Sequence, residues 1–427
     1  MADAHVENEN NLDEDRVTEK GPPKWRSTRF FLAYFLGLGL VVIFYQRVSF
    51  SMAIVCMMNH TALDLHRQRS GADGPFVWDK ELQGLLLGAL YWGYTVAQIP
   101  GSYVIHRRGA RAVVGFSVVA MSLFFTLCHP ASLLSPWAVF ALRVAALAIP
   151  GMYSMWGRWA PVSERAQLLG ISFAGQMVAN ASVFPFTAML CEEGPWGGWP
   201  SVFYVFGGLG LVWSIAWFVL VRDSPEIHPR IDPKEKEYIV NSRAAVTAQQ
   251  EKLDVPWRQI LTSWCFWAIA VAQFTYNWGF FLMISNLPTF MYEAMRFDIK
   301  SNGVFSMLPY ISLFFVMSGA GFLSDFIIKR RFVTVLGARK LYTAIAYVIP
   351  AVLLVVMSHL PCTEVAAVMI LLVVAVGLTG LAPTGGFFVN PYDIAPRYAV
   401  SICTATNTMA TMSGVINPYV VAAVTKD

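Results

Sequence analysis

Two arginines lie inside long apolar segments of this sequence, where a charged side chain is costly to bury. Arg47 lies about midway along VVIFYQRVSFSMAIVCMMNHT, residues 41–61, and Arg143 lies in a second apolar run, residues 136–156. A cation at the centre of a bilayer costs roughly 2.5–3.5 kcal/mol even on the lenient insertion scale. The guanidinium of each arginine should therefore face a cavity, where its planar set of N–H donors can bind a carboxylate or phosphate. We therefore predict that both bind a small anion; a structural arginine bonded to backbone carbonyls is the alternative.

Polar side chains in other apolar segments are candidates for completing such a site. Each of them can instead form an interhelical hydrogen bond, which is worth about 0.6 kcal/mol in a membrane protein, so both interpretations stay open. The candidates are Tyr91, Tyr94, Tyr276, Asn277, Asn390, Tyr392 and Asn407.

The composition places the chain in a lipid bilayer. Hydrophobic residues make up 56% of the 427 residues and charged residues only 14%, whereas soluble domains carry about 25% charged residues. We therefore expect an all-α polytopic membrane protein, as a monomer, with no nucleic-acid partner.

The six cysteines are scattered, and no two have CxxC spacing. We therefore expect no metal, no cofactor and no disulfide framework.

Apolar segments long enough to cross a bilayer fall into groups of six and five. The only long polar stretch inside the chain separates the groups and marks a domain boundary. We predict a disordered cytoplasmic tail (1–29), a six-helix half (30–221), a cytoplasmic loop (222–261) and a second half of about five helices (262–427). The expected spans are 30–55, 83–104, 112–129, 136–156, 167–190, 201–221, 262–291, 303–325, 340–359, 363–389 and 399–423.

Basic residues predict the orientation. When the spans are threaded as above, clusters such as Arg107-Arg108 and Lys329-Arg330-Arg331 fall on the same side as the N-terminus and the central loop. By the positive-inside rule that side is cytoplasmic. The sequon Asn59-His60-Thr61 then lies on the opposite side, where Asn59 is open to glycosylation.

A loop pattern recurs at matched positions in the two halves. GSYVIHRRGAR at 101–111 and GFLSDFIIKRR at 321–331 both follow the second span of their half. The recurrence resembles the signature loop of the major facilitator superfamily, which has two six-helix halves. The resemblance implies roles in gating for Gly101, Arg107, Arg108, Gly109, Arg111, Gly321, Asp325 and Arg330.

Longer stretches resemble the solute-carrier family that includes sialin, the vesicular glutamate transporters and the type I sodium–phosphate cotransporters. They include YQRVSFSMAIV, MWGRWAPVSERAQLLGISFAGQ, FTYNWGFFLMISNLPTFM, FSMLPYISLF and VNPYDIAPRYAVSICTATNTMATMSGVINP. The resemblance implies secondary active transport of small anions by alternating access, with Arg47 meeting the substrate. Asn277 matches the sialin pattern, whereas the glutamate transporters carry arginine there.

The resemblance leaves the substrate and the energy source open. Phosphate, sialic acid and other carboxylates suit buried guanidinium groups. The coupling ion is sodium or a proton, or the membrane potential drives transport. The membrane is the plasma membrane or an endolysosomal or vesicular one.

Two departures from the family pattern support an alternative function. The segment after Arg143, ALRVAALAIPGMYSMW, is shorter by about five residues and lacks the family's glutamate, so Arg143 and Tyr153 keep their family orientations only if the helix is locally rebuilt. The chain also ends where relatives continue into a twelfth span. The alternative is therefore a transport-deficient splice form or relative that acts as a binding or regulatory membrane protein.

Other functional classes find little support. His60 and Asp64 in HTALD are spaced one residue too closely for the HxxxxD of membrane acyltransferases, and no filter-like repeat of a channel is present. We therefore expect that the protein is not an enzyme.

Overall fold

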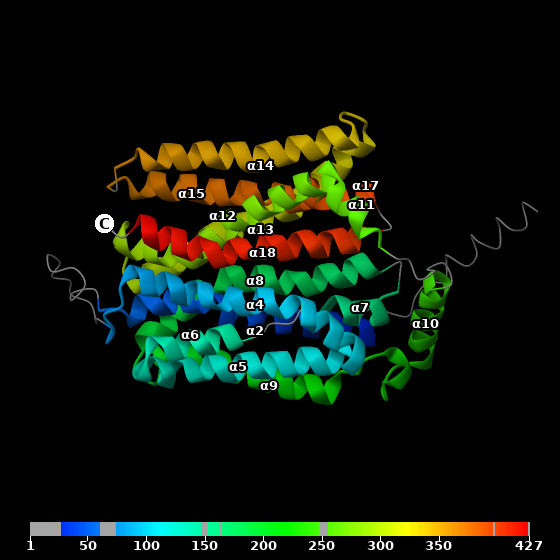
Figure 1. The fold of residues 1–427 in the computed structure, drawn as a ribbon, viewed down its shortest axis with the longest axis horizontal. Coiled ribbons are helices and arrows are strands. Elements are labelled where there is room, and N and C mark those ends of the chain that lie inside the picture. The colour runs from blue at the N-terminus through cyan, green and yellow to red at the C-terminus, as the bar shows by residue number, and fades with distance from the viewer. Residues whose placement is uncertain are drawn as a thin grey trace, which may run out of the picture.

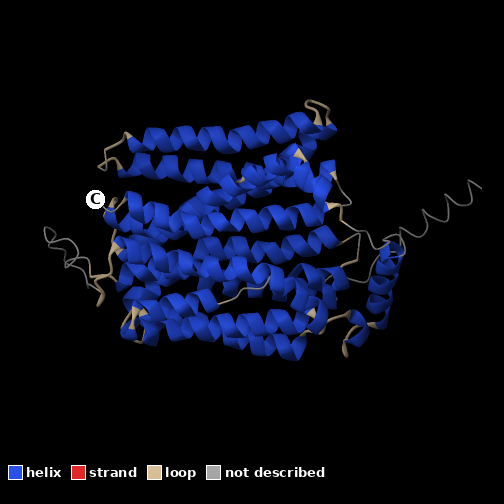
Figure 2. Cartoon of the chain, viewed as in Figure 1, coloured by secondary structure: helices blue, strands red, loops and turns tan. Residues whose placement is uncertain are grey.

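The computed structural model describes residues 27–59, 74–146, 152–161, 164–247, 255–361, 363–395 and 398–425. Within these ranges the chain is almost entirely helical (Figure 2), and the only β pairing is an isolated bridge between Met58 and Phe76. The predicted all-α membrane fold is confirmed. His60, Thr61 and Asp64 lie outside the described residues, as do most of the predicted tail and part of the central loop.

The first group of helices occupies one side of the molecule (Figure 1). Its α4 begins at a capping residue, Asp79, whose carboxylate accepts the Leu82 N–H at 2.8 Å, and α6 begins with Pro136 after Ser135. The helices are α2 (Thr28–Met57), α4 (Lys80–Arg108), α5 (Ala110–Leu134), α6 (Pro136–Ala145), α7 (Met152–Trp159), α8 (Arg165–Glu193) and α9 (Pro200–Leu220).

The second group packs on the other side, and short helices lie between the groups in the chain. The connecting elements are η2 (Pro225–Ile227), α10 (Pro233–Thr247) and α11 (Trp257–Thr262). The second group contains α12 (Trp264–Glu293), α13 (Ile299–Lys329), α14 (Val335–Ser358), α15 (Val365–Thr379), α16 (Leu381–Gly385), η3 (Phe387–Val389), α17 (Asn390–Ile394) and α18 (Ala399–Val424).

The long helices run side by side, as transmembrane helices must. Among the described helices, eight are long and apolar enough to cross a membrane by length and composition. The helix α10 lies beyond one end of the bundle (Figure 1). We call this the α10 end, and we call the opposite end, where α2 and α8 finish, the distal end.

Two of the expected spans differ from the prediction in their bounds. The fourth, predicted over 136–156, is divided into α6 and α7, and residues 147–151 between them lie outside the described part of the chain. The side chain of Tyr153 is also outside the description, so the local rebuilding of this helix stays a prediction. The tenth, predicted over 363–389, continues through the short helices α16, η3 and α17 to Ile394.

A buried ion-pair network fixes the α10 end. Arg29 is 0% exposed, and its Nε lies 2.6 Å from Glu164 while its Nη1 lies 3.0 Å from Glu235 on α10. The backbone N–H groups of Thr28 and Arg29 also donate to Glu235. The Glu235 carboxylate therefore caps α2 and attaches α10 to the first helix group.

The first signature loop forms a tight turn. Gly109 joins α4 to α5 with a φ of +84°, and a Cβ atom there would lie 2.8 Å from Asp223. The Asp223 carboxylate accepts the backbone N–H of Arg111 at 2.9 Å, and Arg111 donates from its side chain to the Phe218 carbonyl. The loop is therefore attached to the chain that follows α9.

The other residues of the two signature loops differ in how far they are buried. Gly101 is buried within α4, Arg107 and Arg108 are exposed, and the Arg330 guanidinium lies 5.5 Å from the Phe326 ring. Gly321 lies within α13, and the side chain of Asp325 is outside the description. Their predicted gating roles stay predictions.

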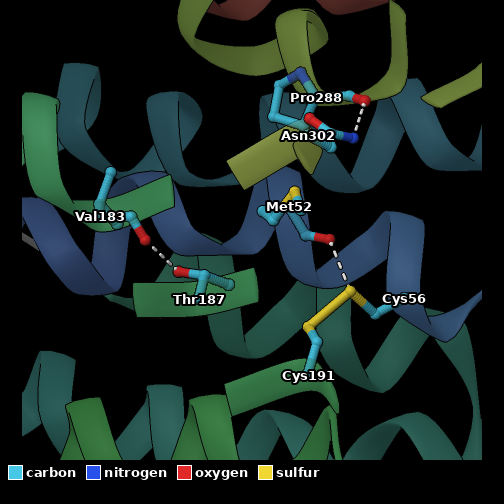
Figure 3. Close-up of a disulfide and its surroundings, with 7 residues drawn as sticks. All are labelled: Met52, Cys56, Val183, Thr187, Cys191, Pro288 and Asn302. Atoms are coloured by element: carbon cyan, nitrogen blue, oxygen red, sulfur yellow. Dashed lines mark hydrogen bonds between the residues drawn. A yellow bond between two sulfur atoms is a disulfide. The ribbon is translucent and has the colours of Figure 1, made fainter. Parts of the chain in front are cut away.

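The expectation of no disulfide was wrong. Cys56, at the end of α2, is bonded to Cys191, near the end of α8, with a Cα–Cα distance of 6.3 Å (Figure 3). The two residues are 135 apart in sequence, so spacing gives no signal. They meet because α2 and α8 pack along their length, from Ser172 near Ala33 to Ser182 near Tyr45.

We predict that the Cys56–Cys191 disulfide stabilises the first helix group. Replacing both residues by alanine should lower the free energy of unfolding by about 2–4 kcal/mol, because closing a long loop restricts the unfolded chain. Thermal unfolding in detergent measures this as a lower Tm. The control is Cys128→Ala, which removes a buried free thiol. Alkylation of both Cys56 and Cys191 without prior reduction would contradict the prediction.

Candidate functional site

The two helix groups pack against each other through three helix pairs. They are α4 with α18, α8 with α13, and α2 with α12. A large hydrophobic cluster crosses this seam and includes Val48, Phe184, Leu287 and Val415. Trp92 also donates its indole N–H to the Tyr419 hydroxyl at 3.3 Å.

Ion pairs join the same two groups at the distal end. Lys80, at the start of α4, pairs with Glu293, at the end of α12. Lys300, near the start of α13, lies 2.6 Å from Glu193 and 3.3 Å from Glu192 at the end of α8. Charges and packing therefore close the seam at the distal end.

Packing at the α10 end is different. The cluster that includes Phe30, Trp156 and Trp217 is drawn from the first group and α10. The clusters around Ile269 and Phe387, and around Ile260 and Ile402, are drawn from the second part of the chain. The two groups therefore have separate cores at the α10 end and a shared core towards the distal end.

Arg47 lies at this seam and is surrounded by aromatic rings. Its guanidinium carbon is 4.8 Å from the Tyr91 ring centre, 5.3 Å from Tyr94 and 5.3 Å from Phe281, a residue of the opposite group. The Phe44 ring is at 5.5 Å. The side chain is half-buried, and no described carboxylate forms an ion pair with it. The guanidinium donors therefore remain available to an anion.

Arg143 is enclosed in the first group instead. It is 3% exposed, its Nε donates to the Leu86 carbonyl at 3.0 Å, and its guanidinium carbon lies 3.8 Å from the Phe50 ring centre. A void of about 10 Å³ beside it is also lined by Gln46 and Cys128. This environment resembles the alternative of a carbonyl-bonded structural arginine.

The remaining candidates are not gathered around Arg47. Tyr91 and Tyr94 contact it, whereas the Tyr276 ring packs on Phe388 at 5.5 Å. Asn277 and Asn390 are half-buried, and Tyr392 is exposed. Asn407 accepts a hydrogen bond from Gln273 at 3.4 Å. The structure therefore brings together three of the predicted residues, and substrate binding by all of them stays a prediction.

The sequence analysis missed residues that line the Arg47 site. Phe281 and Phe44 present ring faces to the cation, an arrangement that favours a guanidinium at short range. Phe281 is part of FTYNWGFFLM, but that stretch does not show which of its aromatic residues faces inward. Among the described residues, no cluster of three His, Cys, Asp or Glu side chains is arranged to hold a metal.

Comparison with known proteins gives a family match. The sequence profile described as Major Facilitator Superfamily matches residues 35–418. Sialin from Ovis aries is 35% identical over 424 residues, covering 94% of this chain and 84% of the relative. Vesicular glutamate transporter 1 from Xenopus tropicalis is 33% identical over 406 residues, covering 93% of this chain and 69% of the relative.

Solved structures share the fold at low sequence identity. A bacterial homolog of the human lysosomal transporter Spinster, in an inward-facing and occupied conformation, superposes with a TM-score of 0.72 at 15% identity, covering 93% of this chain and 82% of that one. A D-xylose–proton symporter superposes with a TM-score of 0.61 at 11% identity, covering 92% of this chain and 89% of that one.

We predict that the Lys80–Glu293 pair helps to hold the distal end closed. Lys80→Glu or Glu293→Lys alone places like charges together, which should increase labelling of a cysteine introduced at Val415 by a reagent added at the distal side several-fold. The double reversal should restore protection, because it restores the pair. Lys340→Glu, at an exposed position on α14, is the control. Labelling in the double reversal that equals either single variant would refute this role.

Proposed function

The chain belongs to the Major Facilitator Superfamily and, within it, to the family that contains sialin and the vesicular glutamate transporters, and we propose that it transports small organic or inorganic anions by alternating access. The observation that carries the proposal is Arg47, a guanidinium at the seam with aromatic neighbours and no described acidic partner. A cation kept in the membrane interior without a counter-charge favours an anionic ligand.

Alternating access agrees with how the two groups pack. We take residues 30–221 and 262–427 as the moving halves. Their shared core and ion pairs lie towards the distal end, and their cores at the α10 end are separate. This is the packing expected of a state that opens towards the α10 end. Breaking the distal ion pairs while bringing the α10 ends together would expose Arg47 to the other side.

We assign the α10 end to the cytoplasm. The basic residues Arg107, Arg108 and Arg330 are exposed there, as the positive-inside rule requires. The disulfide lies at the distal end, and disulfides persist in oxidising compartments. The distal side would then be the lumen or the exterior, with Asn59 open to glycosylation, in either the plasma membrane or an endolysosomal or vesicular membrane.

The acidic side chains of the structure bear on which energy source drives transport. None of the described Asp or Glu side chains contacts Arg47 or Arg143 in the hydrogen bonds and ion pairs of the structure. This supports a sodium gradient or the membrane potential over a proton relay through an intramembrane carboxylate.

We predict that Arg47→Ala strongly reduces anion uptake into proteoliposomes that contain the full chain. Loss of a charge-assisted hydrogen bond of about 1.5–3 kcal/mol should lower transport by at least tenfold, and Arg47→Lys should recover only part of it, because lysine lacks the planar fork. Phosphate and small carboxylates are the probes, tested with an imposed sodium gradient, pH gradient or potential.

The matched control is Arg258→Ala, which removes an exposed arginine on α11. An uptake rate that Arg47→Ala leaves unchanged would overturn the role of Arg47. A folded, inserted wild-type chain without uptake would favour the transport-deficient alternative, which the shortened segment after Arg143 suggested.

A further inference from the structure

Two polar side chains on α8 and α13, the helices that join the halves, are fully buried without hydrogen bonds to the described residues. Asn180 on α8 is 1% exposed, and neither its amide nitrogen nor its oxygen has a partner among the described residues. Tyr310 on α13 is 2% exposed, and its hydroxyl also has no partner there. Because nearly all buried polar groups in proteins are hydrogen-bonded, these two require a physical explanation.

Both residues lie where the two halves meet. The Tyr310 ring is 5.5 Å from the Phe184 ring of α8, and Tyr310 belongs to the same buried hydrophobic cluster as Tyr91. Asn180 is one helical turn before Phe184 on α8. Tyr91 is also the ring nearest to the Arg47 guanidinium. The pair therefore lies at the seam between α8 and α13, in the core that also contains the Tyr91 and Phe281 rings beside Arg47.

Packing alone does not explain these side chains. Phenylalanine at 310 would fill the same space against Phe184 and would bury no hydroxyl, and leucine at 180 would occupy nearly the volume of the amide. An unpaired buried donor or acceptor costs free energy until a ligand or a water molecule pairs with it. Tyr310 and Asn180 together provide donors and acceptors without any charge.

We propose that Tyr310 and Asn180 are specificity-determining residues that bind a neutral hydrogen-bonding group of the transported anion, while Arg47 holds its charged group. This inference rests on the proposed anion transport. A hydroxyl or amide of the substrate would satisfy the Tyr310 hydroxyl and both polar atoms of Asn180. A bare carboxylate would leave them unpaired, and sites built to hydrogen-bond a substrate group reject analogues that lack it.

Tyr310→Phe tests the inference, because it removes only the hydroxyl. The probes are gluconate and acetate, which share a carboxylate but differ in hydroxyl groups, with uptake measured in proteoliposomes containing the full chain. We expect the KM for gluconate to rise about tenfold and the KM for acetate to stay unchanged. Asn180→Leu should change the KM values in the same direction. The Tm of Tyr310→Phe should not fall, because the ring remains against Phe184.

Tyr342→Phe is the matched control, because the Tyr342 hydroxyl on α14 is also buried without a partner, but the Tyr342 ring lies against Gly385 of its own half and not against α8 as Tyr310 does. It should leave both KM values unchanged. A gluconate KM that Tyr310→Phe leaves unchanged, or a wild-type chain that does not prefer gluconate to acetate, would overturn this inference alone if uptake still depends on Arg47. A wild-type chain without uptake of any anion would overturn the proposed function and this inference with it.

Discussion

Lipid cannot solvate a charge or form a hydrogen bond, and this constraint governs where Arg29, Arg47 and Arg143 lie. Arg29 has two carboxylate partners and attaches α10 to the bundle. Arg143 has a carbonyl oxygen and a ring face. Arg47 has ring faces but no described carboxylate. The three environments differ in how many guanidinium N–H donors are free to bind a ligand. Of these three arginines, Arg47 alone keeps its donors available at the seam between the halves.

The same seam contains the features that transport requires. Its core is apolar and continuous towards the distal end, and its rim is held by partly exposed ion pairs, each worth little by itself. A closure made of many weak contacts can be opened and reformed without unfolding either half. The disulfide and the Arg29 network, in contrast, both act within the first helix group or between it and α10. They stabilise that half as a rigid unit and leave the seam free to move.

The buried polar groups at the seam can link ligand binding to the arrangement of the two halves. Asn180 and Tyr310 lie on helices that join the halves, and Tyr310 belongs to the buried cluster that also contains Phe44, Tyr91 and Phe281. A ligand that pairs with them and with Arg47 would contact α2, α8 and α13 together. Binding would then depend on how the halves are arranged, which is the coupling that alternating access needs.

The sequence by itself determined the membrane class, the apolar helices and the position of Arg47 in the first of them, because burial in lipid imposes long apolar segments that composition reveals directly. Only the tertiary structure decided which residues meet. It brought Phe281 to Arg47, Cys56 to Cys191 and Tyr310 to Phe184, and it separated Tyr276 from Arg47. Helices that are apolar on all sides carry no periodic signal for the inward face, so rotation and pairing are set by side-chain packing between segments far apart in the chain.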